Sequence, residues 1–216
     1  ISDYLIKPVN PNQILMAVKK ILDNRRIQGE QAQSAYMREF RELAMQLGGR
    51  LNAEEWSEVY RRLCHWQLTL GDSGDGGMLE ILENQHAEAN HQFARFIEDH
   101  YEHWMTGMEQ GPVMSHQVLP TWLPDALAGS EGRPLFLVVI DNLRWDQWRT
   151  IAPTLRPKWN VVEEKTYYSI LPTATQYARN ALFAGMTPGD IARMMPNLWI
   201  GEHYQGSKNA HEETLQ

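Results

Sequence analysis

The sequence predicts a mixed fold, in which an all-α three-helix bundle lies between a short strand–helix unit and the start of an α/β domain. Three observations favour it. Residues 28–107 carry apolar residues at helical spacing in three successive stripes. Leu135–Ile140 is apolar without alternation, as in a strand covered on both faces. Tyr4–Ile6 is a short apolar run ended by Lys7-Pro8, which is typical of a buried strand and a sharp turn.

The N-terminal strand should lead into a helix. Asn10 can cap this helix, with Pro11 at its first position. Its apolar face follows at helical spacing: Ile14, Leu15, Val18, Ile21 and Leu22. The chain enters the strand with no starting Met and stops as a helix begins, so we expect a fragment of a longer protein, cut at both ends.

The bundle has recognisable helix boundaries. Gly48-Gly49 predicts the end of its first helix, and Asn52 followed by Glu55 is a capping signal for the second. The glycine-rich segment 71–77 predicts a turn, and Gly107 closes the third helix. The apolar stripes are Tyr36, Phe40, Leu43, Ala44 and Leu47; Trp56, Val59, Tyr60, Leu63 and Leu70; and Met78, Leu82, Ala89, Phe93, Phe96, Ile97 and Trp104.

After Gly111-Pro112 strand and helix signals alternate, which indicates an α/β sheet. The run at 135–140 predicts its first strand, and a second is expected within residues 160–170. Helices are predicted over 145–155, from the segment 171–175 to Gly185, and after Thr187-Pro188.

Composition excludes several classes of protein. A net charge of −7 argues against a broad surface for coating nucleic acid. The single cysteine, Cys64, excludes an intramolecular disulfide and fits a reducing compartment, so we expect a cytoplasmic protein. No long apolar run and no signal-peptide pattern is present, and we expect no membrane insertion.

Asp141 is the first candidate site residue. It follows the predicted strand 135–140, at the sheet edge where α/β folds place their ligands. A carboxylate there can bind a metal ion. A helix N-cap for the segment from Asn142 is an equally good interpretation at this point.

Thr175 is the second candidate. A threonine at a helix start lies beside free N–H groups that favour an anion, and its hydroxyl can attack phosphorus if a metal ion lowers its pKa. Thr173 could serve instead, and an ordinary threonine cap is the more frequent use of such a residue.

The segment Leu171-Pro172-Thr173-Ala174-Thr175, continued to Gly185 and preceded by Ile140-Asp141-Asn142, resembles the opening of a PglZ-type domain of the alkaline-phosphatase superfamily. The resemblance implies that Asp141 and Thr175 share a zinc ion and that Thr175, rather than Thr173, is the nucleophile. Asn142 and Arg179 are further candidate contacts for the substrate phosphate, although a surface salt bridge is an equally good interpretation of Arg179. A complete domain would hold two zinc ions.

Asp3–Pro8 and the helix after it resemble the end of a flavodoxin-like response-regulator receiver domain. In that resemblance Lys7 contacts the phosphoryl group and Tyr4 is the switch aromatic. Residues 1–26 would be the end of the receiver, 27–110 the helical linker bundle, and 111–216 the N-terminal part of the PglZ-type domain.

This order of domains resembles PorX-type response regulators, which are associated with type IX secretion. The resemblance implies a two-component phosphorelay with a sensor histidine kinase, a homodimer on phosphorylation, and a zinc-dependent phosphodiesterase output that acts on oligonucleotide-like substrates. A sigma factor or a secretion component is a further expected partner.

The superfamily's other zinc ligands are Asp and His residues in Asp-x-x-x-His and Asp-His pairs, which residues 190–216 do not offer. We therefore expect this fragment to be inactive by itself. The alternative is a non-catalytic output module that binds a transcription or secretion partner. The bundle could also be a dimerising transmitter, which is compatible with either function.

Overall fold

The computed structural model describes residues 10–73, 76–200, 206 and 208–215. The chain divides into two compact units, residues 1–100 and 101–216. The predicted receiver residues Tyr4 and Lys7, and the strand assigned to Tyr4–Ile6, lie outside the described residues.

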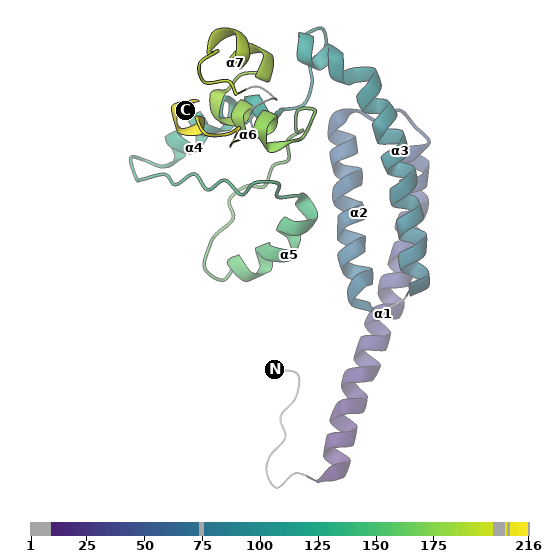
Figure 1. Ribbon diagram of the computed structural model, residues 1–216. Helices are drawn as coiled ribbons and strands as arrows, with labels where there is room; N and C mark the ends of the chain where they lie inside the picture. The colour runs from purple at the N-terminus through teal and green to yellow at the C-terminus, as the bar shows by residue number, and fades with distance from the viewer. Residues whose placement is uncertain (1–9, 74–75, 201–205, 207, 216) are drawn as a thin grey trace. The chain divides into compact units, whose positions relative to one another are not determined.

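The first unit is a three-helix bundle, as predicted. It consists of α1 (Pro11–Leu47), α2 (Ala53–Ser73) and α3 (Gly76–Thr106), of which the part up to His100 belongs to this unit. In Figure 1, α2 and α3 run alongside the later part of α1, whereas the first part of α1 extends beyond them. Their buried core draws on each of them: Tyr36, Leu43, Leu47, Trp56, Val59, Leu63, Leu70, Leu82 and Ala89. Tyr60, which the stripe placed in the core, is 38% exposed.

Polar contacts fix how these helices face one another. Arg62 of α2 pairs with Glu39 of α1 and donates a 2.8 Å hydrogen bond to Oε1 of Gln46. Inside the core, the Tyr36 hydroxyl donates to Oε1 of Gln85 at 3.1 Å, and Nε2 of Gln85 donates to the Phe40 carbonyl at 3.1 Å. A buried amide that satisfies both its donor and its acceptor favours one helix register over its neighbours.

Both predicted capping signals are present. The Asn10 side chain accepts from the backbone N–H of Asn12, and Pro11 is the first helical residue. The Asn52 side chain accepts from the N–H groups of Glu54 and Glu55, while Glu55 accepts from the Asn52 N–H at 2.8 Å. These bonds satisfy N–H groups that have no partner within the helix.

Helix α1 is longer than the sequence predicted. The expected N-terminal helix and the first bundle helix form one element of 37 residues, which passes through the predicted domain boundary at residues 26 and 27. The intervening residues are mostly good helix formers, and Arg26 pairs with Glu30 one turn later at 2.8 Å. The apolar face predicted in its first turns is exposed, with exposed fractions of 42–70% for Ile14, Leu15, Val18, Ile21 and Leu22.

The second unit contains short helices around a small core. They are a 3₁₀ turn η1 (Ser115–Gln117), α4 (Val118–Gly129), α5 (Trp145–Leu155), α6 (Thr175–Ala184), α7 (Pro188–Met194) and α8 (Glu212–Leu215). Met114, Ile170 and Ala181 are buried together, and the last turns of α3 pack on them through Tyr101, Trp104 and Met105.

The prediction of two strands in this unit is wrong for the residues that the structure describes. Leu135–Ile140 is irregular, and every one of its side chains is at least 40% exposed. Within residues 160–170 there is only a parallel bridge, in which the Ser115 N–H donates to the Tyr168 carbonyl at 3.1 Å. A strand requires a hydrogen-bonded partner along its length, and none of the described segments pairs with residues 135–140.

Candidate functional site

The predicted strand residue and the predicted helix residue meet in the second unit. Asp141 follows the apolar segment 135–140 in a tight turn, and Thr175 is the first residue of α6. The Thr175 hydroxyl donates a hydrogen bond of 3.0 Å to Oδ2 of Asp141. Thirty-four residues separate the two in sequence, so the contact is tertiary.

Both capping interpretations are wrong. The N-cap of α6 is Ala174, whose backbone is extended, so the Thr175 hydroxyl does not cap this helix. The N-cap of α5 is Arg144 rather than Asp141. Neither side chain therefore caps a helix, which is the most frequent role of Asp and Thr at a helix start.

Arg179 joins the pair from the next turn of α6. Its Nη1 donates to the same oxygen, Oδ2 of Asp141, at 3.3 Å. Residues four apart on a helix lie on one face, which is why Thr175 and Arg179 reach a common carboxylate. The side chains of Arg179 and Asp141 are 30% and 42% exposed, so solvent reaches this ion pair and weakens it.

A buried amide network holds the start of α6. Asn180, only 3% exposed, donates to the carbonyl groups of Gln176 and Lys208 at 2.9 and 3.1 Å. Asn209 donates to the Thr175 carbonyl at 3.2 Å and to Oδ1 of Asn180 at 2.9 Å. These bonds fix the backbone that carries Thr175, whereas the hydrogen bond to Asp141 fixes its hydroxyl.

The other end of α6 is also well defined. Gly185 ends the helix as predicted, with a left-handed φ of 62°. A Cβ atom there would come within 3.2 Å of Cγ of Pro120 in α4. Glycine is therefore favoured at this position by conformation and by space.

Tyr167 and Asn142 complete the surroundings of Asp141. Burial raises the pKa of the Tyr167 phenol, and the negative charge of Asp141 raises it further. Asn142 has a φ of 56°, a conformation that asparagine tolerates better than most residues. Both predicted phosphate contacts are therefore neighbours of Asp141. Asn142 follows it in the chain, and Arg179 contacts it through a hydrogen bond.

The donor atoms suit two positions of a zinc site. Two oxygen ligands on one tetrahedral zinc ion, each about 2.0–2.2 Å from the metal, lie roughly 3.3 Å apart. The 3.0 Å between the Thr175 hydroxyl and Asp141 Oδ2 is close to that separation. Within the described part of the chain, no three His, Cys, Asp or Glu side chains gather as a metal site, so Asp141 and Thr175 would be at most two of the about four ligands that a zinc ion needs.

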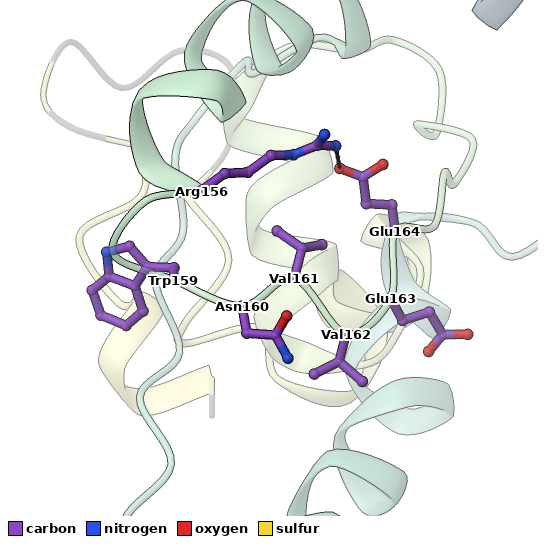
Figure 2. Close-up of a pocket in the computed structure, with 7 residues that line it drawn as sticks. All are labelled: Arg156, Trp159, Asn160, Val161, Val162, Glu163 and Glu164. Carbon is purple, nitrogen blue, oxygen red and sulfur yellow. Dashed lines mark ion pairs between the residues drawn. The ribbon is translucent and has the colours of Figure 1, made fainter.

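A concave surface lies elsewhere in this unit. A hollow of about 430 Å³ is lined by residues of one segment, Arg156 and Trp159–Glu164 (Figure 2). Glu164 accepts a 3.0 Å hydrogen bond from Nε1 of Trp148 and pairs with Arg156 at 3.7 Å. Its carboxylate thus binds α5 to this segment, and neither Asp141 nor Thr175 borders the hollow.

Sequence reasoning missed the residues that support the pair. Asn180 lies five residues after Thr175, and its burial could be suspected only once α6 was placed against η1 and α8. Asn209 comes from a segment without periodicity or motif, so no local signal indicates its contact with Thr175. Tyr167 was part of a predicted strand, and its proximity to Asp141 depends on the tertiary fold.

No described helix is both long and apolar enough to cross a membrane.

Residues 26–105 match the family described as the PorX response regulator linker domain. Residues 119–216 match the BREX system PglZ alkaline phosphatase-like domain. No curated protein matches the chain. The two family matches, in this order along one chain, support a PorX-like response regulator with a PglZ alkaline phosphatase-like output domain.

Proposed function

We propose that the output domain is a zinc-dependent phosphodiesterase in which Thr175 is the nucleophile and Asp141 a metal ligand. The observation that carries this proposal is the 3.0 Å hydrogen bond between the Thr175 hydroxyl and Asp141, which joins the two residues despite their separation in sequence. The alkaline phosphatase-like match over residues 119–216 supports the reaction class.

The chain's own residues would contribute in three ways. Asp141 orients the Thr175 hydroxyl by accepting its hydrogen bond, and the amide network of Asn180 and Asn209 holds the backbone beneath it. The first turn of α6 presents N–H groups that favour phosphoryl oxygens. Arg179 and Asn142 are proposed to contact the same phosphoryl group. A bound zinc ion would supply the lowered hydroxyl pKa that threonine needs to attack phosphorus.

The linker match supports the regulatory part of the proposal, to the extent that it indicates a response regulator. We assign residues 1–26 to the end of a receiver domain, 27–110 to the linker bundle and 111–216 to the output domain. Lys7 and Tyr4 would then belong to the receiver switch. In this proposal the protein is cytoplasmic, is phosphorylated by a sensor histidine kinase and dimerises on phosphorylation. Its output domain acts on oligonucleotide-like substrates. It takes part in the control of type IX secretion, with a sigma factor or a secretion component as partner.

The test is turnover of a chromogenic phosphodiester, bis(4-nitrophenyl) phosphate, by the complete protein and its variants. Thr175→Ala should lower kcat by about a thousandfold or more, because it removes the attacking oxygen. Thr175→Ser keeps a hydroxyl and should retain measurable turnover. Thr173→Ala, two residues earlier and exposed, is the matched control and should stay within about threefold of wild type.

Turnover by Thr175→Ala close to that of wild type would refute the role of Thr175. A wild-type protein that binds zinc but leaves phosphodiesters intact would refute the enzyme. An inert protein that also binds no zinc would favour the alternative, a binding module for a transcription or secretion partner.

A further inference from the structure

We propose that Arg179 competes with a divalent cation for Oδ2 of Asp141 and thereby sets the affinity of the site for that cation. The inference rests on the proposed function and adds a role for a residue outside the ligand pair. Its origin is geometric. Nη1 of Arg179, at 3.3 Å, and the Thr175 hydroxyl, at 3.0 Å, converge on one carboxylate oxygen.

The competition follows from the chemistry of the guanidinium group. Arginine keeps its positive charge throughout the pH range in which proteins are folded, so it cannot withdraw its charge by losing a proton. A divalent cation that binds Oδ2 takes the lone pairs to which Nη1 donates. It also places two positive charges within a few ångströms of a third. Binding therefore requires Arg179 to leave the oxygen or to remain at an electrostatic cost.

The position of Arg179 makes it a regulator of affinity rather than a barrier to binding. Its side chain is 30% exposed, and it is anchored on a helix whose backbone is held by Asn180 and Asn209. The guanidinium can swing away by changing side-chain torsions while α6 stays in place. Because Arg179 and Thr175 lie four residues apart on one face of α6, a guanidinium displaced from Asp141 would remain on that face, where it would donate to a phosphoryl oxygen.

The experiment measures zinc affinity directly, by competition with a chromogenic chelator and by calorimetry, using the complete protein. Arg179→Gln should bind zinc about tenfold more tightly than wild type, because it removes one positive charge from the site but keeps a polar side chain. Arg179→Lys keeps the charge and should stay within about threefold of wild type. Raising the salt concentration should reduce the difference in zinc affinity between Arg179→Gln and wild type, because the Arg179–Asp141 pair is partly exposed.

Two further variants make the result specific. Arg193→Gln removes an arginine that pairs with Asp190 on α7, and it controls for the change in net charge within the same unit. It should leave zinc affinity unchanged. Asp141→Asn removes the shared carboxylate and should lower zinc affinity by at least about tenfold. Circular dichroism of each variant establishes that it is folded.

The outcomes separate the two proposals. If Asp141→Asn loses zinc but Arg179→Gln binds it with unchanged or weaker affinity than Arg193→Gln, competition by Arg179 is refuted while the metal site stands. If Asp141→Asn binds zinc as wild type does, Asp141 is not a ligand, and the proposed zinc site fails together with the inference.

Discussion

Tyr36 is the residue whose ionisation should be most visible in the stability of the bundle. Its side chain is completely buried, and burial raises the pKa of its phenol from 10.0 to about 12. Its hydroxyl donates to Oε1 of Gln85, and a tyrosinate has no proton to donate to that oxygen. The folded bundle therefore requires neutral Tyr36.

The predicted pH dependence follows from linkage. The folded state holds the Tyr36 proton up to about pH 12, whereas the unfolded state releases it above pH 10. The stabilisation is fully present below pH 10. The free energy of unfolding should then fall by about 1.4 kcal/mol per pH unit between pH 10 and 12. Urea unfolding of wild type and Tyr36→Phe at several pH values measures this loss, because other groups titrate alike in both proteins. Equal slopes in the two proteins would contradict the prediction.

For single residues, the sequence indicates a candidate where the position of the residue relative to a predicted strand or helix suggests where its side chain lies. Asp141 follows an apolar run and Thr175 lies at a predicted helix start, and these positions alone make both residues candidates for a site. Sequence reasoning failed for Asn209 because a side-chain amide has no preferred partner along the chain. Its hydrogen bond to the Thr175 carbonyl exists only once residues 208–215 lie beside α6. The roles of Asp141, Thr175 and Arg179 in binding and catalysis remain predictions.

At the scale of elements, helices were predictable and strands were not. A helix satisfies its backbone hydrogen bonds internally, so Asn10 and Asn52 reveal where α1 and α2 begin. A strand depends on a partner that local sequence does not identify, and residues 135–140 have none among the described segments. The length of α1 was missed because no proline or turn motif separates its two predicted halves, and the single glycine between them, Gly29, does not interrupt the helix.

Leu82 provides the prediction for the helices of the bundle. It is 1% exposed in the core that α3 shares with α1 and α2. Leu82→Ala should lower the free energy of unfolding by about 2–5 kcal/mol, through lost burial and the cavity left behind. Its neighbour Ile81 is 37% exposed, so Ile81→Ala is the matched control and should cost clearly less. Chemical denaturation followed by circular dichroism measures both. Similar losses in the two variants would show that the core does not depend on Leu82.

At the scale of the whole chain, the family matches and the compact units give similar but not identical divisions. The linker match ends at residue 105, the first unit ends at His100, and the predicted boundary was at residue 110. The boundaries differ because α3 continues to Thr106 and its last turns pack on Met114 and Ile170. A change in hydrophobic period marks where a helix ends, which need not be where a folding unit ends.

The exposed segment Leu135–Ile140 should govern how the 216-residue chain associates. Six consecutive apolar residues with side chains at least 40% exposed form a template for intermolecular strand pairing. Static light scattering over a concentration series should show self-association of the wild-type chain. Val138→Lys should reduce it, because a charge interrupts the apolar run. Val162→Lys changes an exposed valine outside this six-residue run and should have a smaller effect. Scattering that is the same for Val138→Lys and wild type would refute the role of this segment.

The unbroken course of α1 has a mechanical consequence. A helix of 37 residues is about 55 Å long, at a rise of 1.5 Å per residue. Its last turns are clamped by the packing of Tyr36, Leu43 and Leu47, whereas its first turns carry exposed apolar side chains. Such a rod acts as a lever: over the roughly 37 Å between Tyr36 and Pro11, a tilt of about 10° at the packed turns displaces the first turn by roughly 6 Å. By the same geometry, a force that displaces the first turns rotates the packed turns by only a small angle, but it acts on them with a large torque.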